Sequence, residues 1–145
     1  RGGKLVAHKV QPDIVFAIDV ANHPELDRGY TNHRKIGQGF MIVHYDKTLA
    51  VNEKLLTYVK SLANDLGLHF QNDMFSGGGT DAGNAHLEAG GRLAMVLGIP
   101  LRMCHGAYSL AHKDDINGVI EFILKFVQTI EKEDYISFIN FTGGK

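Results

Sequence analysis

The chain has 145 residues, enough for one domain with a substantial hydrophobic core and too few for two domains of ordinary size. Apolar residues make up 44% and charged residues 21%, and the formal net charge is −1, which is the balance of an ordinary soluble globular protein. These values argue against nucleic acid or an anionic membrane as the main partner. A single cysteine, Cys104, cannot form an internal disulfide, which fits a cytoplasmic location, and no apolar run approaches the ~20 residues of a membrane span.

The first part of the chain predicts two strands separated by a long polar loop. Residues 13–19 are almost all apolar, as expected of a strand covered on both faces, and residues 39–44 predict a second strand. Loops as long as the one between them are usually functional or disordered. The loop contains basic side chains that could face an acidic substrate, although a solvated basic loop explains them more simply: Arg28, His33, Arg34 and Lys35.

The rest of the chain predicts helices that alternate with strands. Apolar residues at helical spacing predict a helix that starts at Asn52 and is capped at Gly67. The other expected elements are a strand at 68–71, a helix capped by Thr80 and ending at Gly90, a strand at 93–99 broken by Pro100, extended chain at 101–105, and a helix capped by Asp114 or Asp115. This alternation predicts a three-layer α/β/α sandwich with a mixed, largely parallel sheet.

Two polar residues, Asp19 and His105, lie at predicted strand ends. At the carboxyl end of a buried strand in an open α/β sheet, side chains project into the crevice where ligands bind. Asp19 could also simply accept hydrogen bonds from the following loop, and a histidine at such a place is often a half-buried packing residue. If residues 101–105 are extended, Cys104 and His105 point to opposite faces and cannot easily ligate one ion, so the imidazole is the favoured donor. Carboxylate and neutral imidazole together form a normal donor set for zinc or a neighbouring transition metal.

The segment GGGTDAG, residues 77–83, is the third candidate feature. Gly77, Gly79 and Ala82 match the loose dinucleotide-binding pattern G-x-G-x-x-G/A, but no acid follows at the required distance and no lysine completes a P-loop. A tight turn explains the glycines, with Asp81 favourable in the positive first turn of a helix. The same geometry would also bring the backbone close to a substrate.

Three segments together resemble the dinuclear metallo-aminopeptidases of the glutamyl-aminopeptidase, TET and deblocking-aminopeptidase type. They are AIDVA, GGGTDAGNAHLEAGG and IPLRMCHGAYSLAHKDDI, and their order and spacing agree with that family over nearly the whole chain. GGTDAG with a downstream R-x-x-H is specific, whereas AIDV alone is not. The chain departs from the family at Gly106, where serine is common, and at Met103 and Cys104, where Tyr-Ile is common; these changes concern the neighbouring pocket rather than ligation.

The resemblance implies that Asp19 and His105 are ligands of two different ions in a co-catalytic pair of zinc or cobalt. In such a pair, ions about 3.5–4 Å apart polarise the scissile carbonyl and activate a water, while a glutamate acts as general base. Gly79, Thr80 and Asp81 would then lie beside the peptide substrate. The full-length protein is expected to be a homo-oligomer in the cytoplasm, without nucleic-acid or membrane partners.

The resemblance also implies that residues 1–145 are the C-terminal portion of a metallopeptidase catalytic domain. In the family, a Glu-Glu pair that supplies the base and a ligand precedes an Arg-Gly segment, and this chain begins at Arg1-Gly2 without an initiator methionine. The general-base glutamate, the remaining ligands and an inserted oligomerisation domain are therefore expected upstream of Arg1. The fragment alone is expected to be inactive.

Two other functions stay open beside the metal-dependent aminopeptidase. An endoglucanase-type polysaccharide hydrolase needs two carboxylates that flank a glycosidic bond, and the sequence offers no convincing second acid near Asp19. A non-catalytic structural or binding module would use Asp19 and His105 only as packed polar groups.

Overall fold

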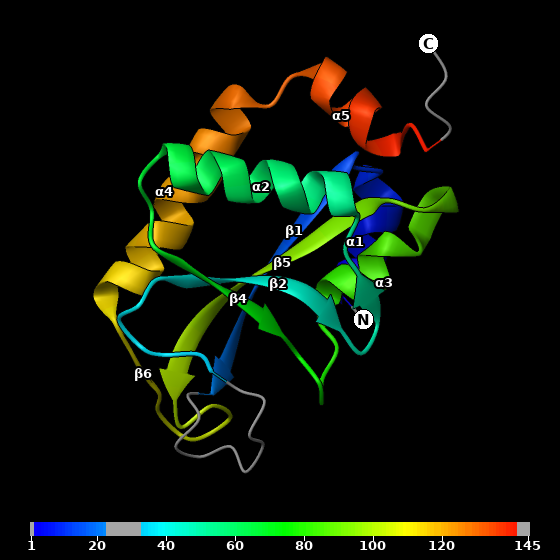
Figure 1. Cartoon of the computed structure of the whole chain (residues 1–145). Coiled ribbons are helices and arrows are strands. Elements are labelled where there is room, and N and C mark those ends of the chain that lie inside the picture. Colours follow the sequence, from blue (N-terminus) through cyan, green and yellow to red (C-terminus); the bar gives the residue numbers. More distant parts are fainter. Residues whose placement is uncertain (1, 23–32, 142–145) are drawn as a thin grey trace.

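The structure is a computed structural model that describes residues 2–22 and 33–141. Its helices and strands are shown in Figure 1. The helices are α1 (Gly2–Val10), α2 (Glu53–Asp65), α3 (Asp81–His86), α4 (Lys113–Thr129) and α5 (Lys132–Ile139). The strands are β1 (Ile14–Asn22), β2 (Phe40–Asp46), β3 (Leu49–Ala50), β4 (Phe70–Met74), β5 (Leu93–Arg102) and β6 (Leu110–Ala111).

The strands of the described residues form one mixed, six-stranded sheet. β1 and β5 are parallel neighbours, and their pairing runs from Ile14 opposite Leu93 to Asn22 opposite Leu101. β2 lies on the other side of β5 in the antiparallel direction and pairs in parallel with β4. The short strands β3 and β6 pair in the antiparallel direction with β2 and β5, respectively. β1 is therefore an edge of the sheet within the described residues, and the carboxyl ends of β1 and β5 lie side by side.

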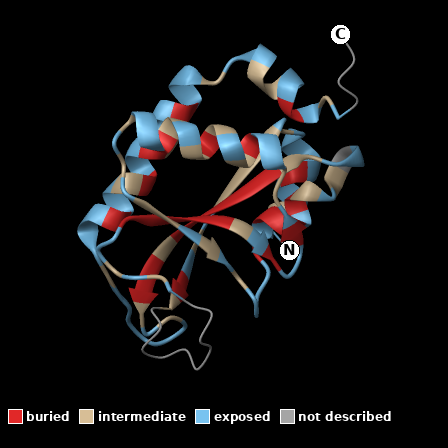
Figure 2. Ribbon diagram, in the orientation of Figure 1, coloured by how far each residue is buried: buried red, intermediate tan, exposed pale blue. Residues whose placement is uncertain are grey.

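Helices cover both faces of the sheet, which confirms the predicted α/β/α sandwich (Figure 1). Successive side chains of a strand point to opposite faces, so β2 contributes to two cores. Phe40 and Ile42 pack with the apolar sides of α2 and α4, whereas Met41 and Val43 pack on the opposite face with Ala82 of α3. Figure 2 shows the buried residues gathered in the central strands and on the helix sides that face them.

α2 follows the sequence prediction closely. Asn52 caps the helix, since its side chain accepts a hydrogen bond from the Leu55 N–H at 3.0 Å. Gly67 has a φ of 67°, the left-handed conformation in which helices commonly end on glycine. A side-chain cap at Asn52 and a left-handed glycine at position 67 therefore fix where α2 begins and ends.

The predicted break at Pro100 is wrong, and the extended chain predicted at 101–105 is confirmed only for Leu101 and Arg102. β5 continues through Pro100, which lies between the residues of β5 that pair with β2 and those that pair with β6, so the missing N–H interrupts neither ladder. The strand ends at Arg102 instead, because Met103 and His105 adopt left-handed φ angles of 60° and 64°.

Three other predicted boundaries differ from the structure. The helix after Thr80 ends at His86, and a separate 3₁₀ turn covers Glu88–Gly90. β4 starts later than the predicted strand at 68–71. Neither Asp114 nor Asp115 caps α4; the cap is His112, whose Nδ1 accepts from the Asp114 N–H at 3.3 Å.

Asp115 has a different role, because its fully buried carboxylate holds the segment before β2 against α4. It accepts hydrogen bonds from the Gly37 N–H at 2.7 Å and the Gly39 N–H at 2.8 Å. No helix in the described part of the chain combines the length and apolar character needed to cross a membrane.

Candidate functional site

Asp19 and His105 lie toward the carboxyl ends of two adjacent parallel strands. Asp19 is half-buried on β1, opposite Gly98 of β5, and the strand continues past it to Asn22. His105 is exposed in the turn that follows β5. The fold thus places a carboxylate and an imidazole at the edge of the sheet where open α/β folds bind ligands.

Asp19 faces a cavity of about 680 Å³ between α1 and β1. One of its carboxylate oxygens, Oδ1, accepts from the Val20 N–H at 2.8 Å. Asp81 lines the same cavity, and its Oδ1 accepts from the Gly3 N–H at the start of α1 at 3.2 Å. A second carboxylate therefore lines the cavity that Asp19 faces.

His105 borders a second cavity, of about 350 Å³, which is also lined by Gly77 and Gly78. The left-handed backbone at His105 is unfavourable for a residue with a Cβ by about 1–2 kcal/mol, so other contacts must hold the turn. Such outliers are concentrated at functional sites.

Cys104 lines the same cavity as His105, so the predicted separation of their side chains onto opposite faces of a strand does not hold. Burial, and next the negative charge of Asp19, raise the pKa of the Cys104 thiol. A thiol that stays protonated near neutral pH is a poorer metal donor than a neutral imidazole.

The GGGTDAG turn is held by the buried carboxylate of Asp46, which the sequence did not single out. Asp46 accepts four hydrogen bonds, from the N–H and hydroxyl of Thr48 at 2.6 and 2.8 Å and from the N–H and hydroxyl of Thr80 at 3.1 and 2.7 Å. Burial raises the pKa of Asp46, but the hydrogen bonds from the two threonines outweigh burial and hold the pKa below its ordinary value. Thr80 occupies the cap position of α3, yet its hydroxyl serves Asp46 rather than the helix.

The glycines of this turn make room for a neighbouring side chain. A Cβ on Gly79 would lie 2.7 Å from the Thr48 methyl group, and a Cβ on Gly83 would overlap the Thr48 hydroxyl. The explanation by close approach in a turn therefore holds for Gly79, and Gly83 makes the same close approach from within α3. The pattern of glycines predicted the close approach but not its partner.

The sequence suggested that Arg34 belongs to a solvated basic loop, and for this residue the structure shows otherwise. It forms a bidentate ion pair with Asp73, Nε to Oδ2 at 2.6 Å and Nη2 to Oδ1 at 2.9 Å, and the two side chains are only 9% and 8% exposed. Its guanidinium also lies 5.4 Å from the centre of the Phe75 ring and borders the cavity beside His105. Arg28, in the same predicted loop, lies outside the described residues.

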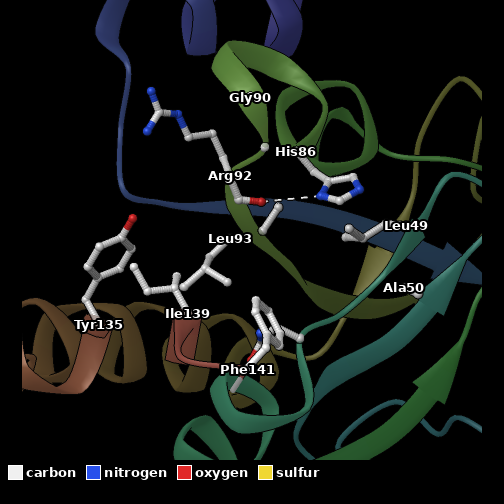
Figure 3. Close-up of a pocket in the computed structure, with 12 residues that line it drawn as sticks. Leu49, Ala50, His86, Gly90, Arg92, Leu93, Tyr135, Ile139 and Phe141 are labelled. Carbon is white, nitrogen blue, oxygen red and sulfur yellow. Dashed lines mark hydrogen bonds between the residues drawn. The ribbon is translucent and has the colours of Figure 1, made fainter. Parts of the chain in front are cut away.

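A further cavity, of about 550 Å³, lies at the other end of the sheet (Figure 3). It is bordered by Leu93 at the start of β5 and by Tyr135, Ile139 and Phe141 at the end of the chain, and the His86 ring contacts the Arg92 carbonyl there at 3.3 Å. This cavity lies at the amino end of β5, whereas Asp19 and His105 lie toward the carboxyl ends of β1 and β5. It is therefore distinct from the candidate metal site.

The donor set fits part of a metal site. Asp19 provides a carboxylate and His105 a ring nitrogen, both common ligands of zinc and its neighbours. Among residues 2–22 and 33–141, however, no group of three or more His, Cys, Asp or Glu side chains is placed to hold a metal ion. Further ligands would have to come from residues other than these.

Comparison with known proteins places the chain among the peptidases. The family model described as M42 glutamyl aminopeptidase matches residues 1–122, and the chain therefore belongs to the M42 peptidase family. It is 32% identical to FrvX of Escherichia coli (strain K12), over 97% of this chain and 40% of FrvX.

Solved structures agree with the family assignment. The TET aminopeptidase of a marine sediment archaeon, Thaumarchaeota archaeon SCGC AB-539-E09, is 28% identical and superposes with a TM-score of 0.90 over 95% of this chain and 39% of that chain. The TET1 peptidase of Pyrococcus horikoshii, which can assemble into a tetrahedron or a large octahedral shell, is 27% identical with a TM-score of 0.70 over 84% and 35% of the two chains. An endoglucanase of Thermotoga maritima shares the fold, with a TM-score of 0.65 at 18% identity. The chain thus spans about two fifths of the length of FrvX and of the Thaumarchaeota TET aminopeptidase.

Proposed function

We propose that residues 1–145 are the C-terminal portion of the catalytic domain of a metal-dependent aminopeptidase that removes N-terminal residues from peptides. One observation carries the proposal: in a chain of the M42 family, Asp19 and His105 lie toward the carboxyl ends of adjacent parallel strands. Because the chain spans only 40% of FrvX, the remaining catalytic groups are assigned to sequence beyond it.

Two exposed apolar surfaces support the assignment to part of a larger domain. β1 has a strand partner on one side only within the described residues, and its side chains Ile18 and Val20 are 57% and 36% exposed. α4 presents a stripe of exposed aliphatic side chains beside its buried face: Ile116, Ile120, Leu124 and Val127. Unpaired apolar strand edges and contiguous apolar stripes mark surfaces that another segment covers. We assign that segment to the upstream half of the same catalytic domain, which would also carry an inserted oligomerisation domain.

Asp19 and His105 would each hold one ion of a zinc or cobalt pair. When bound, such a pair polarises the scissile carbonyl and activates a water. The role of Asp19 is to present its carboxylate from a rigid strand, with Oδ1 already fixed by the Val20 N–H. The role of His105 is to present a neutral imidazole from the turn after β5. The general-base glutamate that moves the proton to the leaving amine is assigned to sequence upstream of Arg1.

The peptide substrate would lie along the GGGTDAG turn. Gly79, Thr80 and Asp81 are proposed to position it through the main chain and the Asp81 carboxylate, because Asp81 shares a cavity with Asp19 and the turn itself is fixed by Asp46. The cavity beside His105 would take the adjacent part of the substrate. The full-length protein is proposed to be a homo-oligomer, a proposal supported by the assembly of the Pyrococcus horikoshii relative. It is also proposed to be cytoplasmic.

An aminopeptidase assay on the full-length protein that contains this chain tests the proposal. Release of the first residue from aminoacyl-anilide substrates should stop when a chelator is added. Asp19→Ala and His105→Ala should lower the rate at least about a thousandfold, as expected when one ion of a two-metal site is lost. Asp13→Ala and His69→Ala serve as matched controls, since both side chains are exposed, and should stay within twofold of the wild type. Wild-type rates in both site variants would reject the assignment of Asp19 and His105.

The division of the catalytic domain has its own test. Residues 1–145 alone should show little or no hydrolysis, because the base and the remaining ligands are absent from them. Appreciable hydrolysis of the same substrates by this chain alone would contradict the division.

An endoglucanase activity is the second candidate, and one observation favours it. Asp19 and Asp81 line the same cavity, and glycoside hydrolases use two carboxylates. A reducing-sugar assay with and without chelator separates the two activities. Sugar release that survives metal removal would favour the glycoside hydrolase.

A further inference from the structure

The turn that carries His105 has an unusual backbone, which neighbouring groups must hold in place. Met103 and His105, on either side of Cys104, are both left-handed although neither is glycine. Within the turn, the Gly106 N–H donates to the Met103 carbonyl at 3.0 Å. A conformation that residues with a Cβ avoid persists only when surrounding groups fix it.

Asn22 supplies the contact that ties this turn to the sheet. Its side-chain Oδ1 accepts from the Cys104 N–H at 2.8 Å in a partly buried position. Among the described residues, the Ser109 hydroxyl also donates to the Met103 carbonyl of the turn at 3.1 Å, but this contact is exposed. The bond to Asn22 therefore acts at the residue between the two left-handed positions, where it can fix both.

Asn22 is itself held firmly. It is the last residue of β1 and lies opposite Leu101 in the parallel pair with β5. The Arg34 Nη1 donates to the Asn22 carbonyl at 3.2 Å, and Arg34 is locked by its nearly buried bidentate pair with Asp73. A chain of hydrogen bonds thus runs from Asp73 through Arg34 and Asn22 to Cys104.

We infer that Asn22 is a positioning residue of the metal site, whose side-chain oxygen sets the place of the His105 imidazole relative to the Asp19 carboxylate. The inference rests on the proposed function. Asp19 and Asn22 belong to the same strand, so the hydrogen bond from the Cys104 N–H to Asn22 fixes the His105 turn to the strand that carries the other ligand. Without this hydrogen bond, His105 can leave the site while Asp19 stays in place.

Zinc affinity of the full-length protein, measured by competition with a chromophoric chelator, tests the inference. Asn22→Leu keeps the approximate volume of the side chain and removes the acceptor. It should lower the affinity for one of the two zinc ions at least tenfold and leave the affinity for the other unchanged. The ion affected should be the same one that His105→Ala loses. Asn22→Asp keeps an acceptor oxygen at the same place and should retain both affinities within fivefold. Asn22→Ala, which adds no bulk, should repeat the effect of Asn22→Leu.

The control is Ser109→Ala, which removes the exposed hydrogen bond to the same turn and should leave both affinities within twofold. Hydrogen exchange of the Cys104 amide gives a second readout that needs no metal: it should accelerate at least tenfold in Asn22→Ala and not in Asn22→Asp. Tight binding of both ions by Asn22→Ala, equal weakening of both ions, or an unchanged Cys104 exchange rate would overturn the inference. A wild-type protein that binds no zinc and releases no N-terminal residue would instead reject the proposed function and, with it, a metal-positioning role for Asn22.

Discussion

Replacing Asp46 by asparagine should destabilise the fold through the GGGTDAG turn. Each carboxylate oxygen of Asp46 accepts from the N–H and the hydroxyl of one threonine, Oδ1 from Thr48 and Oδ2 from Thr80. An asparagine at this place has one oxygen and one NH₂ group. Whichever way the amide is turned, the NH₂ faces a main-chain N–H and leaves that donor without an acceptor in a site that is 1% exposed.

The magnitude follows from these contacts. A buried donor that loses its acceptor costs about 1–3 kcal/mol, and hydrogen bonds to a charged acceptor contribute about 1.5–3 kcal/mol, more than neutral ones. Since one N–H is orphaned and the others lose charge assistance, we expect Asp46→Asn to lower the free energy of unfolding by about 2–4 kcal/mol.

Urea unfolding of the chain, followed by far-UV circular dichroism, measures the change. Asp13→Asn makes the same change of charge at an exposed position and should stay within about 0.5 kcal/mol of the wild type. A loss below about 1 kcal/mol in Asp46→Asn, or one no larger than in the control, would refute the assignment of Asp46 as the anchor of the turn.

Three further outcomes are expected. Because the folded pKa of Asp46 is lowered from 3.8, its contribution is present above that pH and is lost as the pH falls through the lower folded value; the acid limb of a stability profile should therefore be flatter in Asp46→Asn than in the wild type. Gly39 has a φ of 96°, and a Cβ there would overlap a main-chain carbonyl, so Gly39→Ala should lower the free energy of unfolding by about 3–5 kcal/mol. Gly67 has a φ of 67° but open space around it, so Gly67→Ala should lower it by only about 1–2 kcal/mol. Equal losses of the two variants in urea unfolding would contradict the close packing at Gly39. Arg34→Lys should cost about 1.5–3 kcal/mol, since an ammonium cannot keep the bidentate contact with Asp73, and an unchanged unfolding midpoint would argue against that pair.

The fold could be predicted from the sequence wherever a repeating apolar pattern or a capping residue was present. α2 has both, with Asn52 at its start and Gly67 at its end. α1 and α5 were not predicted, because each is short and the first begins at Gly2-Gly3, residues that favour no helix. β5 extended beyond its predicted end, since the effect of a proline depends on the neighbouring strands and not on its own sequence.

The candidate site was predicted as a set of residues but not as an arrangement. Asp19 and His105 could be selected by their places after apolar runs. The left-handed backbone conformation at His105 could not be predicted, because residues other than glycine rarely adopt it. The anchors Asp46 and Asp115 act on residues far along the chain, Thr80 and Gly39 respectively, and only the folded structure brings such partners together.

The zinc content of the full-length protein, measured by mass spectrometry after metal loading and gel filtration, is the decisive test of Asp19 and His105 as metal ligands. We expect two zinc ions per chain in the wild type and only one in Asp19→Ala or in His105→Ala. Two ions in both variants would contradict the assignment of these residues as ligands, and a wild-type protein without metal would favour a non-catalytic module in which Asp19 and His105 are only packed polar groups.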